Sequence, residues 1–336
     1  MKAYIIKAYG DASAAELTEF SEPQLCPHDL RIEVAGMGLN PVDYKTRDGL
    51  LKAIYSPTLP IVMGNELSGV VSECGTEVKN FKVGDKIVAR VEKDRLGAFA
   101  EQVCINEEVA TFAPKSIPLG DAAALPLAAL TAIQALRDEL GASAGKHILI
   151  TGGAGGVGTF AIQIAKYLGA EVTTTASPRG EALVREMGAD HVIDYTKTDL
   201  ADVTTKFDGV FDLIGGDTLK ACFGLAKSGA TVVSISGTPE PVTASKDLQA
   251  GLKLKVIFWL VSFGLRRMAA KFGVTYRYLF MHASGSELAE LVQMVDDGQL
   301  KIIIDKKFDF ADIAEAMAYL EAGRAKGKVI VNIDKT

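Results

Sequence analysis

The strongest constraint on the fold is a glycine cluster between a short β-rich run and a helical pattern. The run HILI occupies residues 147–150, and the apolar residues Ala161, Ile162, Ile164 and Ala165 recur at helical spacing. Between them, Gly153, Gly155 and Gly158 complete a G-x-G-x-x-G pattern. Glycines at these places permit a tight turn, close approach of the backbone to a pyrophosphate, and close packing of helix on strand. Because free N–H groups and the positive end of the helix dipole then face the ligand, the stretch predicts a dinucleotide-binding turn.

Strand-like and helix-like segments alternate after this turn. Such alternation predicts an α/β fold with a doubly wound parallel sheet, helices on both faces and a ligand beyond the carboxyl ends of the strands. The expected strands are 171–175, 191–194, 209–214 and 230–236, and the expected helices are 180–187, 199–205 and 217–226.

The first 122 residues have a different pattern. Short runs rich in valine and isoleucine are separated by glycine and polar turns, which predicts a compact barrel or sandwich. The composition then changes to alanine and leucine near Asp121. We therefore expect a β domain over 1–122 and a nucleotide-binding domain over 123–298, with the helix 286–297 completing the layers of the second.

The tail returns to strand-like and helix-like segments over 302–333. We expect residues 299–336 to fold back onto the first domain and complete it.

Composition narrows the class of function. The formal net charge of −6 argues against a nucleic-acid surface, which needs an excess of Lys and Arg. The four cysteines form no C-x-x-C pair, which favours a reducing compartment, here the cytoplasm, over a disulfide framework. The longest apolar stretch, 256–265, is too short to span a bilayer, so no integral membrane segment is expected. Its basic flank, with Arg266, Arg267 and Lys271, leaves a membrane-surface helix open, although a buried helix or a loop over the active-site cleft is favoured.

The choice of cofactor depends on the end of the second expected strand. An NAD site usually has an acidic residue about 20 residues past the glycines. Here Ala176 and Ser177 stand at that place, and Arg179 follows. With no carboxylate to repel a 2′-phosphate, and a hydroxyl and a guanidinium to bind it, the pattern favours NADPH.

No metal-dependent or covalent chemistry is indicated. The four histidines, His28, His147, His191 and His282, are far apart in the sequence and lack H-E-x-x-H spacing, so a structural role is favoured for His147 and His191. Cys104 on an expected strand is interpreted as a small buried residue. A short-chain dehydrogenase would also fit the glycine turn, but none of the nine tyrosines has lysine four places on.

The order of these motifs resembles the medium-chain dehydrogenase/reductase superfamily, in its zinc-free quinone oxidoreductase or enone reductase branch. The resemblance implies a GroES-like β-barrel substrate domain and a Rossmann sheet domain. The matching stretches are GLNPVDYKTRDG (38–49), PIVMGNELSGVV (60–71), FKVGDKIVA (81–89), GAFAEQV (97–103), LPLAALTAIQAL (125–136), TGGAGGVG (151–158), LGAEV (168–172), MGADHVIDY (187–195) and GRAKGKVIV (323–331).

The resemblance also assigns site residues. In zinc-bearing relatives a cysteine stands at the place of Asn40 and a histidine at the place of Asn65, ahead of a glutamate matching Glu66, so no metal site is expected. It implies that Asn40, Tyr44 and Tyr55 line the substrate cleft. Without a metal, we expect Asn40, Tyr44 or Lys45, or water, to donate hydrogen bonds to the developing oxyanion, and Tyr44 or solvent to supply the proton. The implied cofactor contacts are Thr131, Gly153, Ala154, Gly155, Gly156, Val157, Gly158, Ser177, Arg179, Tyr195, Ile235, Ser236, Gly237 and Arg324.

The expected function is NADPH-dependent hydride transfer to a quinone or to the activated double bond of an α,β-unsaturated carbonyl, without a metal. The alternatives are an NADPH-binding sensor or other non-catalytic relative, and a zinc-free alcohol dehydrogenase. The sequence does not identify the acceptor. Many relatives are homodimers, although no feature of this sequence predicts a dimer interface.

Overall fold

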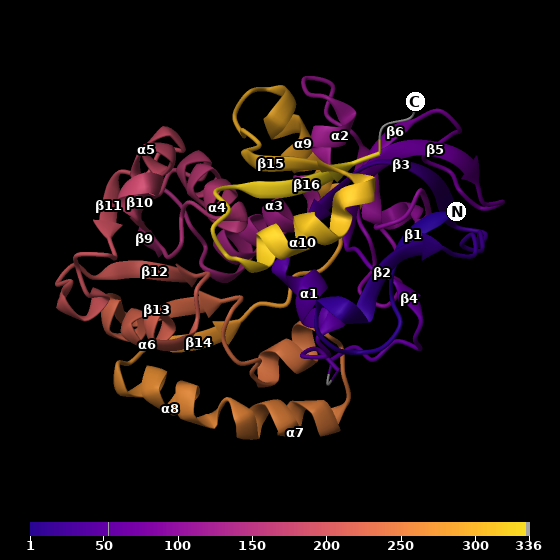
Figure 1. Cartoon of the computed structure of the whole chain (residues 1–336). Coiled ribbons are helices and arrows are strands. Elements are labelled where there is room, and N and C mark those ends of the chain that lie inside the picture. The colour runs from indigo at the N-terminus through magenta and orange to yellow at the C-terminus, as the bar shows by residue number, and fades with distance from the viewer. Residues whose placement is uncertain (53, 334–336) are drawn as a thin grey trace. The chain divides into compact units, whose positions relative to one another are not determined.

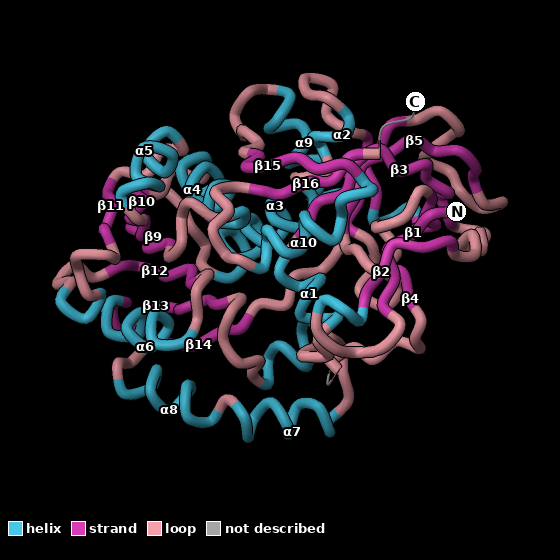
Figure 2. Tube along the Cα trace, in the orientation of Figure 1, coloured by secondary structure: helices cyan, strands magenta, loops and turns pink. Residues whose placement is uncertain are grey.

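The computed structural model describes residues 1–52 and 54–333 and divides into two compact units (Figure 1). Unit 1 contains Met1–Leu130 and Ala283–Thr336, and unit 2 contains Thr131–His282. Each unit has its own sheets (Figure 2).

Unit 2 contains a six-stranded parallel sheet with the order β11-β10-β9-β12-β13-β14. The chain begins at the centre with β9, moves outward to β11, and returns to the other side of β9 with β12. The expected doubly wound sheet is therefore confirmed, and its topological switch point lies between β9 and β12, where such sheets bind their ligands. The strands are β9 (His147–Ile150), β10 (Glu171–Ala176), β11 (His191–Asp194), β12 (Phe207–Asp212), β13 (Ala226–Ser234) and β14 (Thr275–Tyr278), and the α-helices between β9 and β13 are α4 (Gly156–Tyr167), α5 (Pro178–Glu186) and α6 (Gly216–Leu225).

Unit 1 contains a seven-stranded sheet, with the order β15-β16-β3-β5-β6-β8 and β7 paired to β3, and a small sheet β2-β1-β4. The long strand β3 pairs with β5, β7 and the tail strand β16, so the first and last parts of the chain share one sheet. The strands are β1 (Lys2–Ile6), β2 (Ala15–Glu19), β3 (Asp29–Leu39), β4 (Ile61–Val62), β5 (Glu66–Cys74), β6 (Lys86–Arg90), β7 (Gln102–Asn106), β8 (Ala110–Phe112), β15 (Ile304–Asp309) and β16 (Lys328–Asn332), and the helices are α1 (Pro41–Arg47), α2 (Leu119–Ala122), α9 (Gly285–Asp296) and α10 (Ile313–Glu321). The helix α3 (Pro126–Ile133) crosses from unit 1 into unit 2.

The helix α9 lies with unit 1, whereas the sequence placed it in the nucleotide-binding domain. A Cβ atom on Gly285 would stand 2.3 Å from the carbonyl oxygen of Ala110 in β8, so the helix begins in close contact with that strand. At its other end, Asp296 accepts hydrogen bonds from the backbone N–H groups of Lys115 and Ser116. The unit boundaries therefore fall at 130/131 and 282/283 instead of 122/123 and 298/299, because helical periodicity does not show which sheet a helix covers.

The apolar stretch 256–265 also differs from expectation. It forms most of α7 (Leu252–Val261) and the start of α8 (Phe263–Lys271), and in α7 only Phe258 is buried. Leu260 and Val261 are 60% and 58% exposed. The expectation of a buried helix is wrong for this segment, because most of its apolar side chains find no cover within the described residues.

One stretch, Leu119–Glu139, is long and apolar enough to cross a membrane by length and composition. Its most apolar window is 83% buried within the protein, as in core helices, so the stretch is weak evidence of a membrane span.

Candidate cofactor-binding and active site

The glycine turn connects β9 to α4 in unit 2. Its left-handed residue is Gly152, with φ of 69°, and not Gly153. A Cβ atom on Gly153 would stand 2.1 Å from the Thr174 hydroxyl, and one on Gly158 would stand 2.4 Å from the carbonyl oxygen of Gly152. Gly152 therefore makes the turn, while Gly153 and Gly158 allow close packing.

The open side of this turn fits a pyrophosphate. Gly155 is the N-cap of α4, and a Cβ atom there would meet only the carbonyl oxygen of Gly152, at 3.4 Å. The N–H groups of the first helical turn, from Gly156 to Gly158, have no acceptor within the helix. The free N–H groups, the positive end of the helix dipole and the open space beside Gly155 therefore lie together at the turn that the sequence predicted.

A buried carboxylate that the sequence analysis missed organises the switch point. Asp212 ends β12 and is fully buried. One of its oxygens accepts from the Thr151 hydroxyl at 3.0 Å, and the other from the Ser234 hydroxyl at 2.7 Å. The backbone N–H groups of Ile214 and Gly215 also donate to it. Asp212 therefore joins the carboxyl ends of β9, β12 and β13 around the turn.

The adenosine side of the turn has the expected residue types. Ser177 is the N-cap of α5, and Arg179 is exposed on its first turn. Tyr195, which follows β11, is 58% exposed. Asp194 on β11 lies opposite Ala176 at the end of β10, and its carboxylate accepts from the backbone N–H and the hydroxyl of Thr196. These hydrogen bonds, with the cation of Lys197 nearby, lower the pKa of Asp194.

The remaining predicted cofactor residues differ in their surroundings. Thr131 is buried in unit 2. Ile235, Ser236 and Gly237 follow β13, where the Ser236 hydroxyl donates to the carbonyl oxygen of Leu213 at 2.9 Å. Arg324 belongs to unit 1, in the exposed turn before β16.

In unit 1, the predicted residues gather around a second buried carboxylate. Glu66 is fully buried, and one of its oxygens accepts from Asn40 Nδ2 and from Lys328 Nζ, both at 2.6 Å. The other oxygen accepts from the backbone N–H of Leu127 at 2.6 Å. Lys328 Nζ also donates to Asn40 Oδ1 at 2.6 Å. The three side chains therefore form a closed triangle in which an ammonium compensates the carboxylate.

Asp43 and Asn65 extend this network. Asp43 accepts from the Asn40 backbone N–H at 2.7 Å and from Asn65 Nδ2 at 2.6 Å. Burial raises the pKa of Asp43 to about 7, against the opposing effect of these hydrogen bonds. Burial also lowers the pKa of the Arg90 guanidinium to about 10. The region thus holds two buried acidic side chains, Asp43 and Glu66, and two buried basic side chains, Arg90 and Lys328.

This arrangement does not fit zinc. At the two positions where the resemblance places zinc ligands, the chain has Asn40 and Asn65, whereas zinc prefers thiolate, imidazole and carboxylate donors. Both N–H bonds of the Asn40 amide are engaged, with Glu66 and with the carbonyl oxygen of Gly38. Glu66 is already paired with Lys328. Asn40 therefore holds the network together and has no N–H left to donate to a substrate.

The aromatic and basic residues of the predicted cleft are more accessible. Tyr44 and Lys45 lie on α1 and are half-buried. Burial, with Glu321 and Asp48 nearby, raises the pKa of Tyr44. The Tyr55 hydroxyl donates to the carbonyl oxygen of Asp94 at 3.2 Å, and burial raises its pKa to about 12. Both phenols are therefore protonated at neutral pH.

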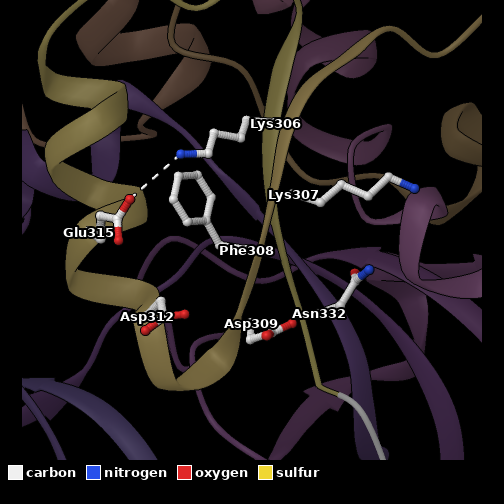
Figure 3. Close-up of a pocket in the computed structure, with 7 residues that line it drawn as sticks. All are labelled: Lys306, Lys307, Phe308, Asp309, Asp312, Glu315 and Asn332. Atoms are coloured by element: carbon white, nitrogen blue, oxygen red, sulfur yellow. Dashed lines mark ion pairs between the residues drawn. The ribbon is translucent and has the colours of Figure 1, made fainter.

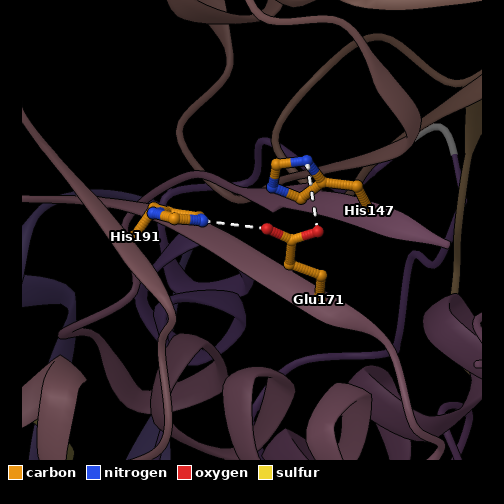
Figure 4. A group of neighbouring side chains, drawn as sticks. All are labelled: His147, Glu171 and His191. Atoms are coloured by element: carbon orange, nitrogen blue, oxygen red, sulfur yellow. Dashed lines mark hydrogen bonds and ion pairs between the residues drawn. The ribbon is translucent and has the colours of Figure 1, made fainter. Parts of the chain in front are cut away.

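Tertiary structure brings together charged residues that are distant in the sequence. Arg47 at the end of α1 is 2% exposed and binds Glu321 of the tail as well as Asp48. His147 and His191 are far apart in the sequence, yet their ring centres lie 5.8 Å apart and both face Glu171 (Figure 4). Neighbouring parallel strands bring them together, which sequence spacing does not show.

Cys104 is 3% exposed, and burial raises the pKa of its thiol to about 11. A thiol that stays protonated at neutral pH is a poor nucleophile. The interpretation of Cys104 as a small buried residue is therefore confirmed.

A polar hollow of about 430 Å³ lies in unit 1 beside β15 and α10 (Figure 3). Lys306 lines the hollow, with its Nζ 4.2 Å from the ring centre of Phe308 and 3.5 Å from Oε1 of Glu315. The hollow contains none of the residues predicted for the site. Its lining is Lys306, Lys307, Phe308, Asp309, Asp312, Glu315 and Asn332.

Two family models together match residues in both units. The family model described as "Alcohol dehydrogenase GroES-like domain" matches residues 26–115, and the one described as "Zinc-binding dehydrogenase" matches residues 187–331. The chain is 36% identical over 358 residues to "NAD(P)H oxidoreductase RTN4IP1, mitochondrial" of Danio rerio, covering 99% of this chain and 91% of that protein. It is also 36% identical over 343 residues to "NADPH-dependent alkenal/one oxidoreductase, chloroplastic" of Arabidopsis thaliana, covering 98% and 79%. The solved structure of the quinone oxidoreductase from Coxiella burnetii matches with a TM-score of 0.86 and 30% identity over 99% of both chains.

Proposed function

Because this chain belongs to the medium-chain dehydrogenase/reductase superfamily, among its quinone and enone oxidoreductases, we propose that it is an NADPH-dependent reductase of quinones or α,β-unsaturated carbonyl compounds that works without a metal. The general assignment as an oxidoreductase follows from the family. The choice of NADPH, the acceptor and the metal-free chemistry are the proposed parts.

The observation that carries the metal-free reaction is the triangle of Asn40, Glu66 and Lys328. A cation already stands 2.6 Å from the one carboxylate that the zinc-bearing relatives retain. Binding a metal ion in place of the Lys328 ammonium would require breaking a buried ion pair, and neither Asn40 nor Asn65 offers the thiolate or imidazole that zinc prefers. The cluster is therefore interpreted as a structural support for α1, which carries Tyr44 and Lys45.

The open glycine turn supports a dinucleotide, and the residues beyond β10 support the phosphorylated one. Ser177 and Arg179 offer a hydroxyl and a guanidinium, while Asp194 is engaged by its own turn. The Arabidopsis relative is named as NADPH-dependent, which agrees with this choice.

Bound NADPH supplies a hydride to the electrophilic carbon of the acceptor. For an enone, the electron pair of the double bond then moves toward the carbonyl oxygen, where hydrogen-bond donors stabilise the negative charge. Tyr44 and Lys45 are the accessible candidates for this role on α1. Since the raised pKa of Tyr44 keeps its phenol protonated, it is also the candidate that transfers a proton to the enolate.

The test is steady-state oxidation of NADPH and of NADH with a panel of quinones and short enones, with and without a zinc chelator. We expect turnover with NADPH that survives chelation. Loss of turnover on chelation, under conditions in which circular dichroism shows that the chain stays folded, would overturn the metal-free reaction. Tight binding of NADPH with no turnover of any acceptor would favour the sensor, and alcohol-dependent reduction of NADP would favour the alcohol dehydrogenase.

A charge-removing variant tests the cofactor choice. Arg179→Ala removes a guanidinium that we assign to the 2′-phosphate, so we expect the KM for NADPH to rise roughly tenfold while the KM for NADH is unchanged. Arg185→Ala is the matched control, because Arg185 lies on the same helix and pairs with Glu181. Equal effects of the two variants, or equal effects on both cofactors, would contradict the assignment.

A further inference from the structure

Three neighbouring strands of unit 2 begin with a residue that can bind a metal. His147 opens β9, Glu171 opens β10 and His191 opens β11. Because the strands are parallel neighbours, their first residues lie at the same end of the sheet. This amino-terminal end is opposite to the carboxyl ends of the strands, where the glycine turn lies.

The strand register places the three side chains on one face. Glu171 is directly opposite His147, and Thr173 is directly opposite His191. Residues two apart on a strand point to the same face, so Glu171 and Thr173 share it, and the two histidines share it with them.

The potential ligand atoms of these side chains all lie within 4.8 Å of one another (Figure 4). Glu171 is central, with one oxygen 2.9 Å from His191 Nε2 and the other 4.0 Å from His147 Nδ1. Ligand atoms around a tetrahedral ion with bonds of about 2.1 Å are about 3.4 Å apart. The two observed separations, each to a different oxygen of Glu171, lie on either side of that value, so the three side chains would have to rotate to bind an ion together.

One ligand is held in place by the core. His147 Nε2 lies 2.7 Å from the hydroxyl of the buried Thr173, and the edge of the ring packs on Phe207 with centres 4.8 Å apart. When Nε2–H donates to Thr173, the lone pair of Nδ1 faces Glu171. Such a hydrogen bond on the second ring nitrogen is a usual support for a metal-binding histidine.

The neighbouring acids are engaged elsewhere. Asp190 accepts from Lys166 Nζ and from the backbone N–H of Val172. Asp208 accepts from Lys227 Nζ and from the backbone N–H of His147. By contrast, Glu171 and His191 are about half exposed, at 52% and 59%, so an ion can reach them from solvent.

We propose that His147, Glu171 and His191 form a binding site for one divalent transition-metal ion of the zinc type, with its fourth position open to water. The site stabilises unit 2 by joining three strands at the end of the sheet that is opposite to the glycine turn. It takes no part in hydride transfer and does not depend on the proposed function.

The experiment uses the full, untagged chain after treatment with a chelator and removal of the chelator. Zn²⁺ is titrated by calorimetry, and Co²⁺ is added separately to record the visible absorption of a tetrahedral complex. We expect one Zn²⁺ per chain and a rise in Tm with Zn²⁺. We also expect His191→Ala, which changes an exposed side chain, to weaken Zn²⁺ binding at least tenfold and to abolish the Co²⁺ band.

The matched control is His28→Ala. His28 is also an exposed histidine paired with a glutamate, Glu77, at 3.4 Å, and Cys26 lies two residues away in the sequence. This variant should bind Zn²⁺ like the wild type. Absence of stoichiometric binding in the wild type would overturn the proposal and leave Glu171 and His191 as an ordinary ion pair. Unchanged binding by His191→Ala, or loss of binding in His28→Ala, would overturn it as well.

Discussion

Each unit contains one fully buried carboxylate at the centre of its candidate site, and the two are stabilised in opposite ways. Glu66 in unit 1 is paired with the ammonium of Lys328 and with an amide and a backbone N–H. Among the described residues, Asp212 in unit 2 accepts from hydroxyl and backbone N–H groups and from no cation. Asp212 also lies just before α6, whose N-terminus favours negative charge.

The comparison shows what each site can be used for. The negative charge of Glu66 is already compensated by the ammonium of Lys328, so the cluster around Glu66 acts as rigid support. A carboxylate held by hydroxyl and backbone donors fixes the backbone around it, so Asp212 shapes the turn where the cofactor is expected to bind. The two sites should therefore respond differently when one partner is removed.

Lys328→Met should have the largest effect. It leaves Glu66 buried without a cation, which costs about 3–5 kcal/mol of the free energy of unfolding. Urea denaturation measures the change. The double variant Lys328→Met with Glu66→Gln should recover most of the loss, and a double variant as unstable as the single one would contradict the charge-pair account.

The acid Asp43, beside this cluster, should make stability depend on pH. Its folded pKa of about 7 exceeds the reference value of 3.8, so the folded state binds more protons between these values. The contribution of Asp43 is fully present below about pH 4 and is lost as the pH rises through 7, by about 2–4 kcal/mol. Urea denaturation over this range should show a smaller decline in Asp43→Asn, and an equal decline in both proteins would refute the assignment.

Asp212→Asn should have a smaller effect on stability and a specific effect on binding. An asparagine amide points N–H donors at groups that are themselves donors, so we expect a loss of about 2–3 kcal/mol and weaker binding of NADPH. Fluorescence titration with NADPH and urea denaturation measure the two changes. Ser234→Ala, which removes one of the donors, should cost only about 1 kcal/mol. Unchanged NADPH affinity in Asp212→Asn would show that the turn does not depend on this carboxylate.

The local patterns and the resemblance predicted much of the architecture. The glycine turn and the alternation after it identified the parallel sheet, because turn chemistry and strand–helix periodicity are local properties. The resemblance singled out Asn40, Asn65 and Glu66, and the structure brings Asn40 and Glu66 into contact. The expectations failed for α9 and for the exposed α7, since periodicity identifies an apolar face and does not say what covers it.

The amino-acid sequence by itself therefore determined the elements, their order and the residue types at the turn, because these depend on neighbours along the chain. Only the tertiary structure decided the partners of the charged groups. Lys328 reaches Glu66 across 262 residues, Thr151 reaches Asp212 across 61, and His191 reaches Glu171 from the next strand. The physical reason is that a buried charge must find its partner in space, and strand pairing, which depends on the packing of the whole unit, decides which residues are close enough to provide it.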